Sequence, residues 1–239
     1  MSDNVAPAAS ESAGFGSQLM GMLNIYIDPA AAVSQIRRKN SWLWPLLIVS
    51  IVAVTVQYMS IPTVMRVMQT NPPSGMTAEQ LERSLPMIQT VQKVTAFAIP
   101  VFMAGMMALS AAVLLGTCSV MGLRSSFREL FSLACHCSLI TILQFIAGFI
   151  VVRMKGDEIQ TLQELQPSFG LGLFIHEGVS KPMMAVLNYF SIFMIWYIVI
   201  MSLTVAHMTG SSKGKGFVAA IPSWLLGLLF FVGMSFLQR

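Results

Sequence analysis

Five long stretches of this chain contain no Asp, Glu, Lys or Arg, and each is at least 23 residues long. At the usual charged fraction of about one residue in four, one such run has a probability on the order of 0.001. As a helix, such a run reaches roughly 35 Å, enough to cross a hydrocarbon core of about 30 Å. We therefore predict an all-α, polytopic membrane protein with five transmembrane helices. The stretches are 41–65, 94–123, 130–152, 182–212 and 216–238.

The composition agrees with this prediction, since 55% of the residues are hydrophobic, 10% are charged and the mean hydropathy is +0.72. The charge-free runs leave too little chain for a separate soluble enzyme domain. The net charge of +4 comes from basic residues between the runs, where they can face anionic lipid headgroups. Nucleic acid is not expected as a partner. The first 17 residues lack a basic region and an apolar run, so the first span should act as the insertion signal.

The domain organisation follows from the same pattern. We expect a disordered tail over residues 1–16, short amphipathic interfacial helices over 17–40, and a five-span membrane domain over 41–239. The expected spans are about 42–61, 98–121, 130–152, 184–208 and 216–237.

The segment before the first span carries a clear helix start. Asp28 suits the N-cap and Pro29 the first helical position, after which Ala32, Val33 and Ile36 share one face. The helix should end near residue 40 in a basic cluster followed by interfacial tryptophans. The predicted lipid-interface anchors are Arg37, Arg38, Lys39, Trp42 and Trp44.

Prolines and caps suggest the boundaries of the next helices. Pro62 should mark the exit of the first span, and Thr77 begins a capping box that leads toward the second span. Pro86 and Pro100 should kink or interrupt that helix. The apolar piece 167–174 is too short to span, and it can be interfacial or re-entrant.

An odd number of spans puts the two termini on opposite sides of the membrane. The Lys and Arg residues then divide seven against seven, so their number does not decide the orientation. Their density does, because those on the N-terminal side lie in two short turns and one juxtamembrane cluster. This favours a cytoplasmic N-terminus and a C-terminus on the opposite side.

Small residues recur every fourth position on three spans, which allows close helix approach in lipid. Such seams favour packing within the bundle, although a partner protein or a second copy could use them. The predicted seam residues are Ala104, Ala108, Ala112 and Gly116, then Ser202, Ala206 and Gly210, then Ala219, Ser223 and Gly227.

No constellation of residues predicts metal binding or catalysis. Cys135, His136 and Cys137 are adjacent, so on a helix their side chains fan over roughly 200° and do not close on one ion. Cys118 could complete a site with one of them, although buried thiols are more typical of core packing. The 19 methionines have no spacing that points to a copper pathway. Nucleophile-elbow, P-loop and zincin motifs are absent. We predict a non-enzymatic protein without a cofactor or metal.

Ionisable residues are nearly missing from the predicted spans, which argues against ion-coupled transport. The intramembrane polar candidates are Gln57, His136, Gln144 and Asn188. Each is more typical of a hydrogen bond between helices than of a transport pathway. A small permease or channel for a neutral or weakly polar solute remains the alternative if the four converge, and an intramembrane enzyme is more remote.

Three pieces of the chain together resemble the bacterial branch of the Yip family, five-span membrane proteins named for Ypt/Rab-interacting relatives. They are an Asp-Pro start followed by Trp-Leu-Trp-Pro-Leu over 28–46, a Phe-Arg link over 122–130, and an aromatic entry to the fourth span over 188–196. Asn188 departs from the family's frequent Asp, and the Cys-His-Cys triplet departs from its Tyr-Ala type sequence. The motif positions are Asp28, Pro29, Phe127, Arg128, Phe193 and Trp196.

The resemblance implies a five-helix fold in the bacterial inner membrane, a cytoplasmic N-terminus and no catalytic residues to carry over. Some bacterial relatives look like accessory proteins of ABC exporters of the macrolide-exporter type. We therefore expect an integral membrane adaptor or regulatory protein, whose partners are membrane lipid and other membrane proteins, with ABC exporter subunits suspected and a homo-oligomer possible.

Overall fold

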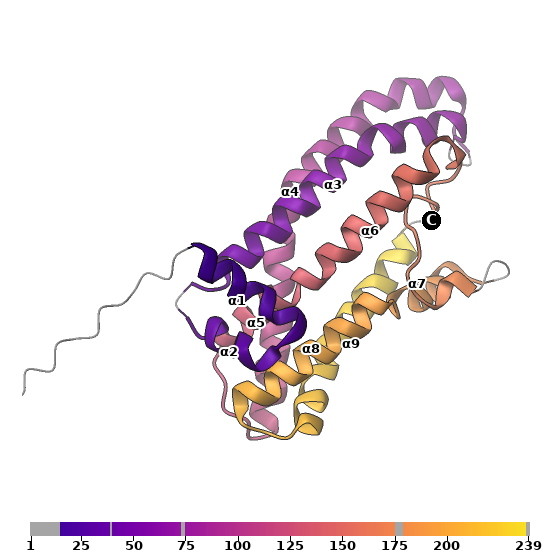
Figure 1. The fold of residues 1–239 in the computed structure, drawn as a ribbon. Helices are drawn as coiled ribbons and strands as arrows, with labels where there is room; N and C mark the ends of the chain where they lie inside the picture. The colour runs from indigo at the N-terminus through magenta and orange to yellow at the C-terminus, as the bar shows by residue number, and fades with distance from the viewer. Residues whose placement is uncertain (1–14, 39, 73–74, 175–178, 238–239) are drawn as a thin grey trace, which may run out of the picture.

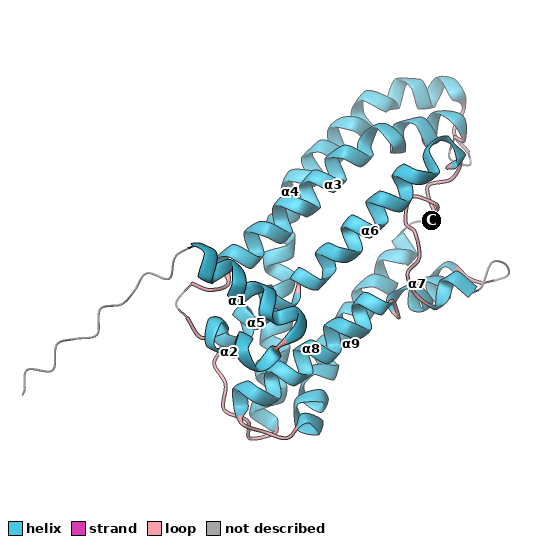
Figure 2. Cartoon of the chain, in the orientation of Figure 1, coloured by secondary structure: helices cyan, strands magenta, loops and turns pink. Residues whose placement is uncertain are grey.

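The structure is a computed structural model that describes residues 15–38, 40–72, 75–174 and 179–237. Most of the predicted tail, residues 1–14, lies outside this range, and residues 15 and 16 belong to the first helix. Within the described ranges the regular elements are helices joined by short loops (Figure 2). The all-α prediction is confirmed.

Among the described residues, five helices are long and apolar enough to cross a membrane, as the charge-free runs predicted. The third crossing consists of two helices, α5 and α6, in close succession. The elements that form the five crossings are α3 (Leu43–Thr70), α4 (Ala78–Val120), α5 (Phe127–Cys137) with α6 (Leu139–Lys155), α8 (Ile192–Thr209) and α9 (Lys213–Leu237).

The crossings pack as two groups (Figure 1). The antiparallel pair α3 and α4 lies beside α6, while α8 and α9 form a second antiparallel pair that contacts α4 through α9. We call the end that holds α1 (Phe15–Ile27), α2 (Pro29–Ile36) and the α4–α5 and α8–α9 turns the basic end. The other end, with the α3–α4 connection, is the hairpin end. Helix α9 ends at the hairpin end, far from α1.

The predicted start of α2 is confirmed. The Asp28 carboxylate accepts a hydrogen bond from the Ala31 amide at 3.0 Å, and Pro29 occupies the first turn. Ala32, Val33 and Ile36 are buried on one face. The helix ends at Ile36, earlier than predicted. The capping box at Thr77 is also present, with Gln80 as its second member.

The prolines do not end the helices in which they lie. Helix α3 continues past Pro62 to Thr70, so the prediction that Pro62 marks an exit is wrong. Helix α4 is unbroken through Pro86 and Pro100, so they do not interrupt it. A proline removes one backbone hydrogen bond, whereas ending a helix in hydrocarbon would leave several backbone groups without partners.

Two predicted spans are divided instead at serines. Helices α5 and α6 separate at Ser138, whose hydroxyl donates to the Cys135 carbonyl at 2.7 Å. The predicted span 184–208 is split into α7 (Lys181–Tyr189) and α8, because the Ser191 hydroxyl caps α8 by accepting from the Met194 amide. The 167–174 piece contains the short 3-10 helix η2 (Leu171–Phe174) and packs against α7.

Helices α8 and α9 approach each other closely at the start of α9. A Cβ at Gly216 would collide with the Ser202 carbonyl and with Ala206 on α8. Ala219 and Ser223, farther along α9, are buried as well. The absence of a side chain at position 216 therefore sets how closely the two helices approach.

We predict that Gly216→Ala lowers the thermal stability of the protein in detergent, because the added methyl group must push α9 away from α8. Overpacking of this kind costs about 1–3 kcal/mol. Gly214→Ala is the matched control, since a Cβ there meets no atom within 4 Å. An equal melting temperature for both variants would show that this contact does not limit stability.

Candidate functional site

The elements of the basic end are joined by polar contacts around Arg37. The Arg37 guanidinium donates a hydrogen bond to the Met208 carbonyl at 2.7 Å, and its Nε lies 3.3 Å from Glu129 Oε1. Met208 is in the last turn of α8, where backbone carbonyls lack helical partners and cations are favoured. We call the assembly of α1, α2, α5 and the last turn of α8 the N-terminal junction.

Glu129 takes part in the junction and also caps its own helix. Its carboxylate accepts from the Ser126 amide at 3.2 Å, while the Ser126 hydroxyl accepts from the Glu129 amide at 3.3 Å. This capping box starts α5 and holds the carboxylate toward Arg37.

Tyr26 fastens α1 to the break in the third crossing. Its hydroxyl donates to the Leu139 carbonyl at 2.7 Å, one residue after Ser138. Its ring lies 5.7 Å from that of Trp196 on α8, measured between centroids. Burial raises the pKa of Tyr26 to about 12. One side chain of α1 thus contacts two of the crossings.

A line of hydroxyl groups leads from the end of α2 into α5. Ser41 donates to the Ile36 carbonyl at 2.8 Å and lies 2.7 Å from the Ser132 hydroxyl. His136 Nδ1 lies 2.8 Å from the Ser132 carbonyl, which can only accept, so Nδ1 carries the proton. His136 Nε2 is then an acceptor, and it is buried without a partner in the described part of the chain.

The predicted lipid anchors take different positions at this end. Arg37 binds protein groups, although its side chain is about half exposed, whereas Arg38 is exposed. Trp42 packs on Phe131 at 5.5 Å, and Trp44 is exposed. Lys39 lies outside the described residues.

Among the described residues no hydrogen bond joins the four intramembrane polar candidates to one another. Gln57 and Gln144 are partly buried, and His136 bonds within its own helix. Asn188 lies in α7 with its Oδ1 buried against Gly172 and without a partner among the described residues. The permease alternative required these four side chains to converge, and no hydrogen bond among the described residues brings them together.

The predicted seams lie in two kinds of environment. Ser202, Ala206, Ala219 and Ser223 are buried where α8 meets α9, and Ser223 also lies 2.5 Å from Ser110 of α4.

The remaining small residues lie elsewhere. Gly210 ends α8 with a left-handed φ of 64°, and Gly227 faces the Tyr189 hydroxyl. On α4, Ala104 and Ala108 are partly buried, but Ala112 and Gly116 are exposed, and a Cβ at Gly116 would meet no atom within 4 Å.

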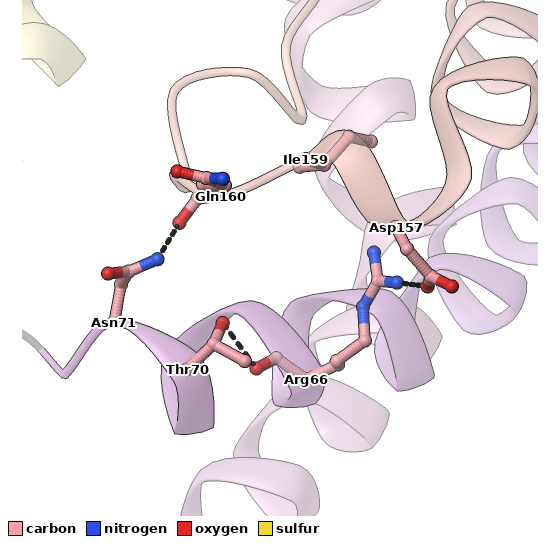
Figure 3. A pocket seen from close by; sticks show the side chains of 6 residues that line it. All are labelled: Arg66, Thr70, Asn71, Asp157, Ile159 and Gln160. Atoms are coloured by element: carbon pink, nitrogen blue, oxygen red, sulfur yellow. Dashed lines mark hydrogen bonds and ion pairs between the residues drawn. The ribbon is translucent and has the colours of Figure 1, made fainter.

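Sequence reasoning missed a hollow at the hairpin end (Figure 3). It has a volume of about 500 Å³, and Arg66 lies at its edge, donating to the Gly156 carbonyl at 2.6 Å and paired with Asp157. The Asn71 amide donates to the Gln160 carbonyl at 2.7 Å across it. The available signal was Arg66 itself, the one charge within α3. The hollow is lined by Arg66, Thr70, Asn71, Asp157, Ile159 and Gln160.

No three His, Cys, Asp or Glu side chains gather into a metal-binding group in the described part of the chain. Cys118, Cys135 and Cys137 are buried free thiols. The chemistry that the junction provides is hydrogen bonding and ion pairing between helices.

The family model described as Yip1 domain matches residues 23–234. This chain belongs to the Yip1 domain family. Comparison with curated proteins and with solved structures found no match.

The first two motif pieces of this Yip1 domain meet at the junction, although they are far apart in the sequence, and Trp196 of the third piece contacts α1. Arg37 of the first piece pairs with Glu129 of the second, and Trp196 of the third lies against Tyr26. Of the other motif positions, Phe127 stacks on Phe131, Phe193 meets Phe169 edge to face, and Arg128 is exposed.

We predict that Arg37→Gln loosens α2 from the bundle. Loss of a partly exposed ion pair and a charged hydrogen bond should cost about 1–2 kcal/mol. Hydrogen exchange of the α2 amides should therefore quicken several-fold. Arg38→Gln is the control, because it removes the same charge from an exposed side chain that has no hydrogen bond or ion pair with a described residue. Equal exchange in both variants would contradict a fastening role for Arg37.

A second prediction follows from Tyr26. Its pKa in the docked state, about 12, exceeds the ordinary value of 10.0, so the docked state holds the proton more tightly. The stability that Tyr26 contributes is complete below pH 10 and is lost as the pH rises toward 12. Tryptophan fluorescence should change over this range in the wild type, and the change should be absent in Tyr26→Phe. A transition of equal size in that variant would assign it to another group.

Proposed function

We propose that this Yip1 family protein is a non-enzymatic membrane adaptor or regulatory protein that works by binding other membrane proteins. The partner class we propose is an ABC exporter of the macrolide-exporter type, in the bacterial inner membrane. The exporter and the bacterial membrane rest on the family resemblance alone, whereas the adaptor role also has a structural argument.

The observation that carries the proposal is the face of α4 around Ala112 and Gly116. Both residues are exposed, and space beside Gly116 is open. Transmembrane helices associate through small residues that allow close backbone approach, because lipid supplies no hydrophobic force between them. The face therefore suits contact with a helix of another protein.

We also propose that the basic end is cytoplasmic. Basic residues in short loops near the ends of spans are retained on the cytoplasmic side. Arg124, Arg128, Lys213 and Lys215 lie in or next to two such turns.

Purification from the native membrane in mild detergent tests the adaptor role. Wild-type protein should bring down a stoichiometric membrane partner, and Gly116→Leu should lose that partner several-fold while keeping its melting temperature. Gly233→Leu is a matched control on α9, because a Cβ there also meets no atom within 4 Å. Recovery of the wild-type protein alone would reject the adaptor proposal.

A further inference from the structure

The basic end carries a group of cations that the protein does not neutralise. Five exposed basic side chains there have no hydrogen bond or ion pair with any described residue. They come from three segments that the fold brings to one end of the bundle (Figure 1). We call them the basic surface: Arg38, Arg124, Arg128, Lys213 and Lys215.

The carboxylates described at this end are already engaged. Asp28 caps α2, and Glu129 caps α5 and pairs with Arg37. The hairpin end differs, because ion pairs form there between Arg66 and Asp157 and between Arg83 and Glu79. The hairpin end also holds most of the described carboxylates, so the excess of cations over carboxylates lies at the basic end.

The placement of Lys213 and Lys215 adds to this charge. Both lie in the first turn of α9, which contains no acidic residue. The start of a helix carries a partial positive charge, so cations are disfavoured there unless an anion lies nearby. Arg128 lies in the first turn of α5, where the only acid is Glu129.

Neighbouring apolar side chains indicate how deep in the membrane these cations lie. Phe217 and Val218 follow the two lysines on α9 and are 45% and 55% exposed. Val120 precedes the α4–α5 turn and is 90% exposed, and Phe127 follows Arg124 and is 44% exposed. In a membrane-spanning chain such side chains face lipid, so the adjacent cations lie at the level of the headgroups.

We propose that the basic surface binds the phosphates of anionic lipid headgroups in the leaflet at this end. The lipid anchors named from the sequence lie in the segment 37–44, but Arg37 is tied to Glu129 and Met208, and the two turns supply four of the five cations of the basic surface. We name lipid as the partner because the cations lie at headgroup depth beside lipid-facing residues. Binding of a phosphate free in solution, or of an acidic protein, would not require that position. The proposal is independent of the adaptor role.

Native mass spectrometry of the full chain, purified with dioleoyl phosphatidylglycerol and phosphatidylcholine in equal amounts, tests it. Wild-type protein should retain phosphatidylglycerol, the anionic lipid, in preference to phosphatidylcholine. Lys213→Gln with Lys215→Gln, and Arg124→Gln with Arg128→Gln, should each reduce that preference by about fivefold per cation removed. Lys213→Arg with Lys215→Arg keeps the charge and should keep the preference. Lys93→Gln with Lys155→Gln removes two cations elsewhere and should leave it unchanged.

Three results would overturn the proposal. One is an unchanged preference in both glutamine pairs, and another is an equal loss in the Lys93 and Lys155 control. The third is displacement of the bound lipid by inorganic phosphate or by polyglutamate at matched charge, which would assign the surface to a soluble anion or an acidic protein. A glutamine pair can also alter the melting temperature of the protein in phosphatidylcholine. In that case the variant Lys213→Arg with Lys215→Arg decides, since loss of the lipid preference in this variant also contradicts the proposal.

Discussion

Lipid gives transmembrane helices no hydrophobic reason to associate, so this bundle depends on hydrogen bonds and on close backbone approach. Both are present at definite places. The Arg37 guanidinium joins α2 to the last turn of α8 and to Glu129, and Gly216 lets α9 pack directly on the α8 backbone. The two groups of crossings are thus held together at the basic end and through α4 and α9.

The division of polar groups between the two ends has a functional meaning. At the basic end, carboxylates are engaged within the protein while five cations remain exposed, and at the hairpin end Arg66 is paired beside a hollow. The middle of the bundle holds few such groups, and His136 is bonded within its own helix. This division agrees with the binding role that we propose.

The sequence predicted the number of crossings, because a charge-free run long enough to span is a physical requirement of hydrocarbon. It also predicted the caps at Asp28 and Thr77, which depend on neighbouring residues only. It did not predict the helix breaks at Ser138 and Ser191. Apolar residues continue on both sides of each serine, and hydropathy does not report a local hydrogen bond. Nor did it predict the protein partners of Arg37, since a backbone carbonyl carries no sequence signal and Glu129 is distant in the chain.

The Arg37 contact also orders the events of biosynthesis. Its two partners follow it in the chain by 92 and 171 residues, at Glu129 and Met208. Neither partner exists when α2 leaves the ribosome, so the Glu129 contact forms only after α5 has been made and the Met208 contact only after α8 has been made. Full docking of α2 is therefore a late step of assembly, and a chain truncated before α8 would leave Arg37 without its carbonyl partner.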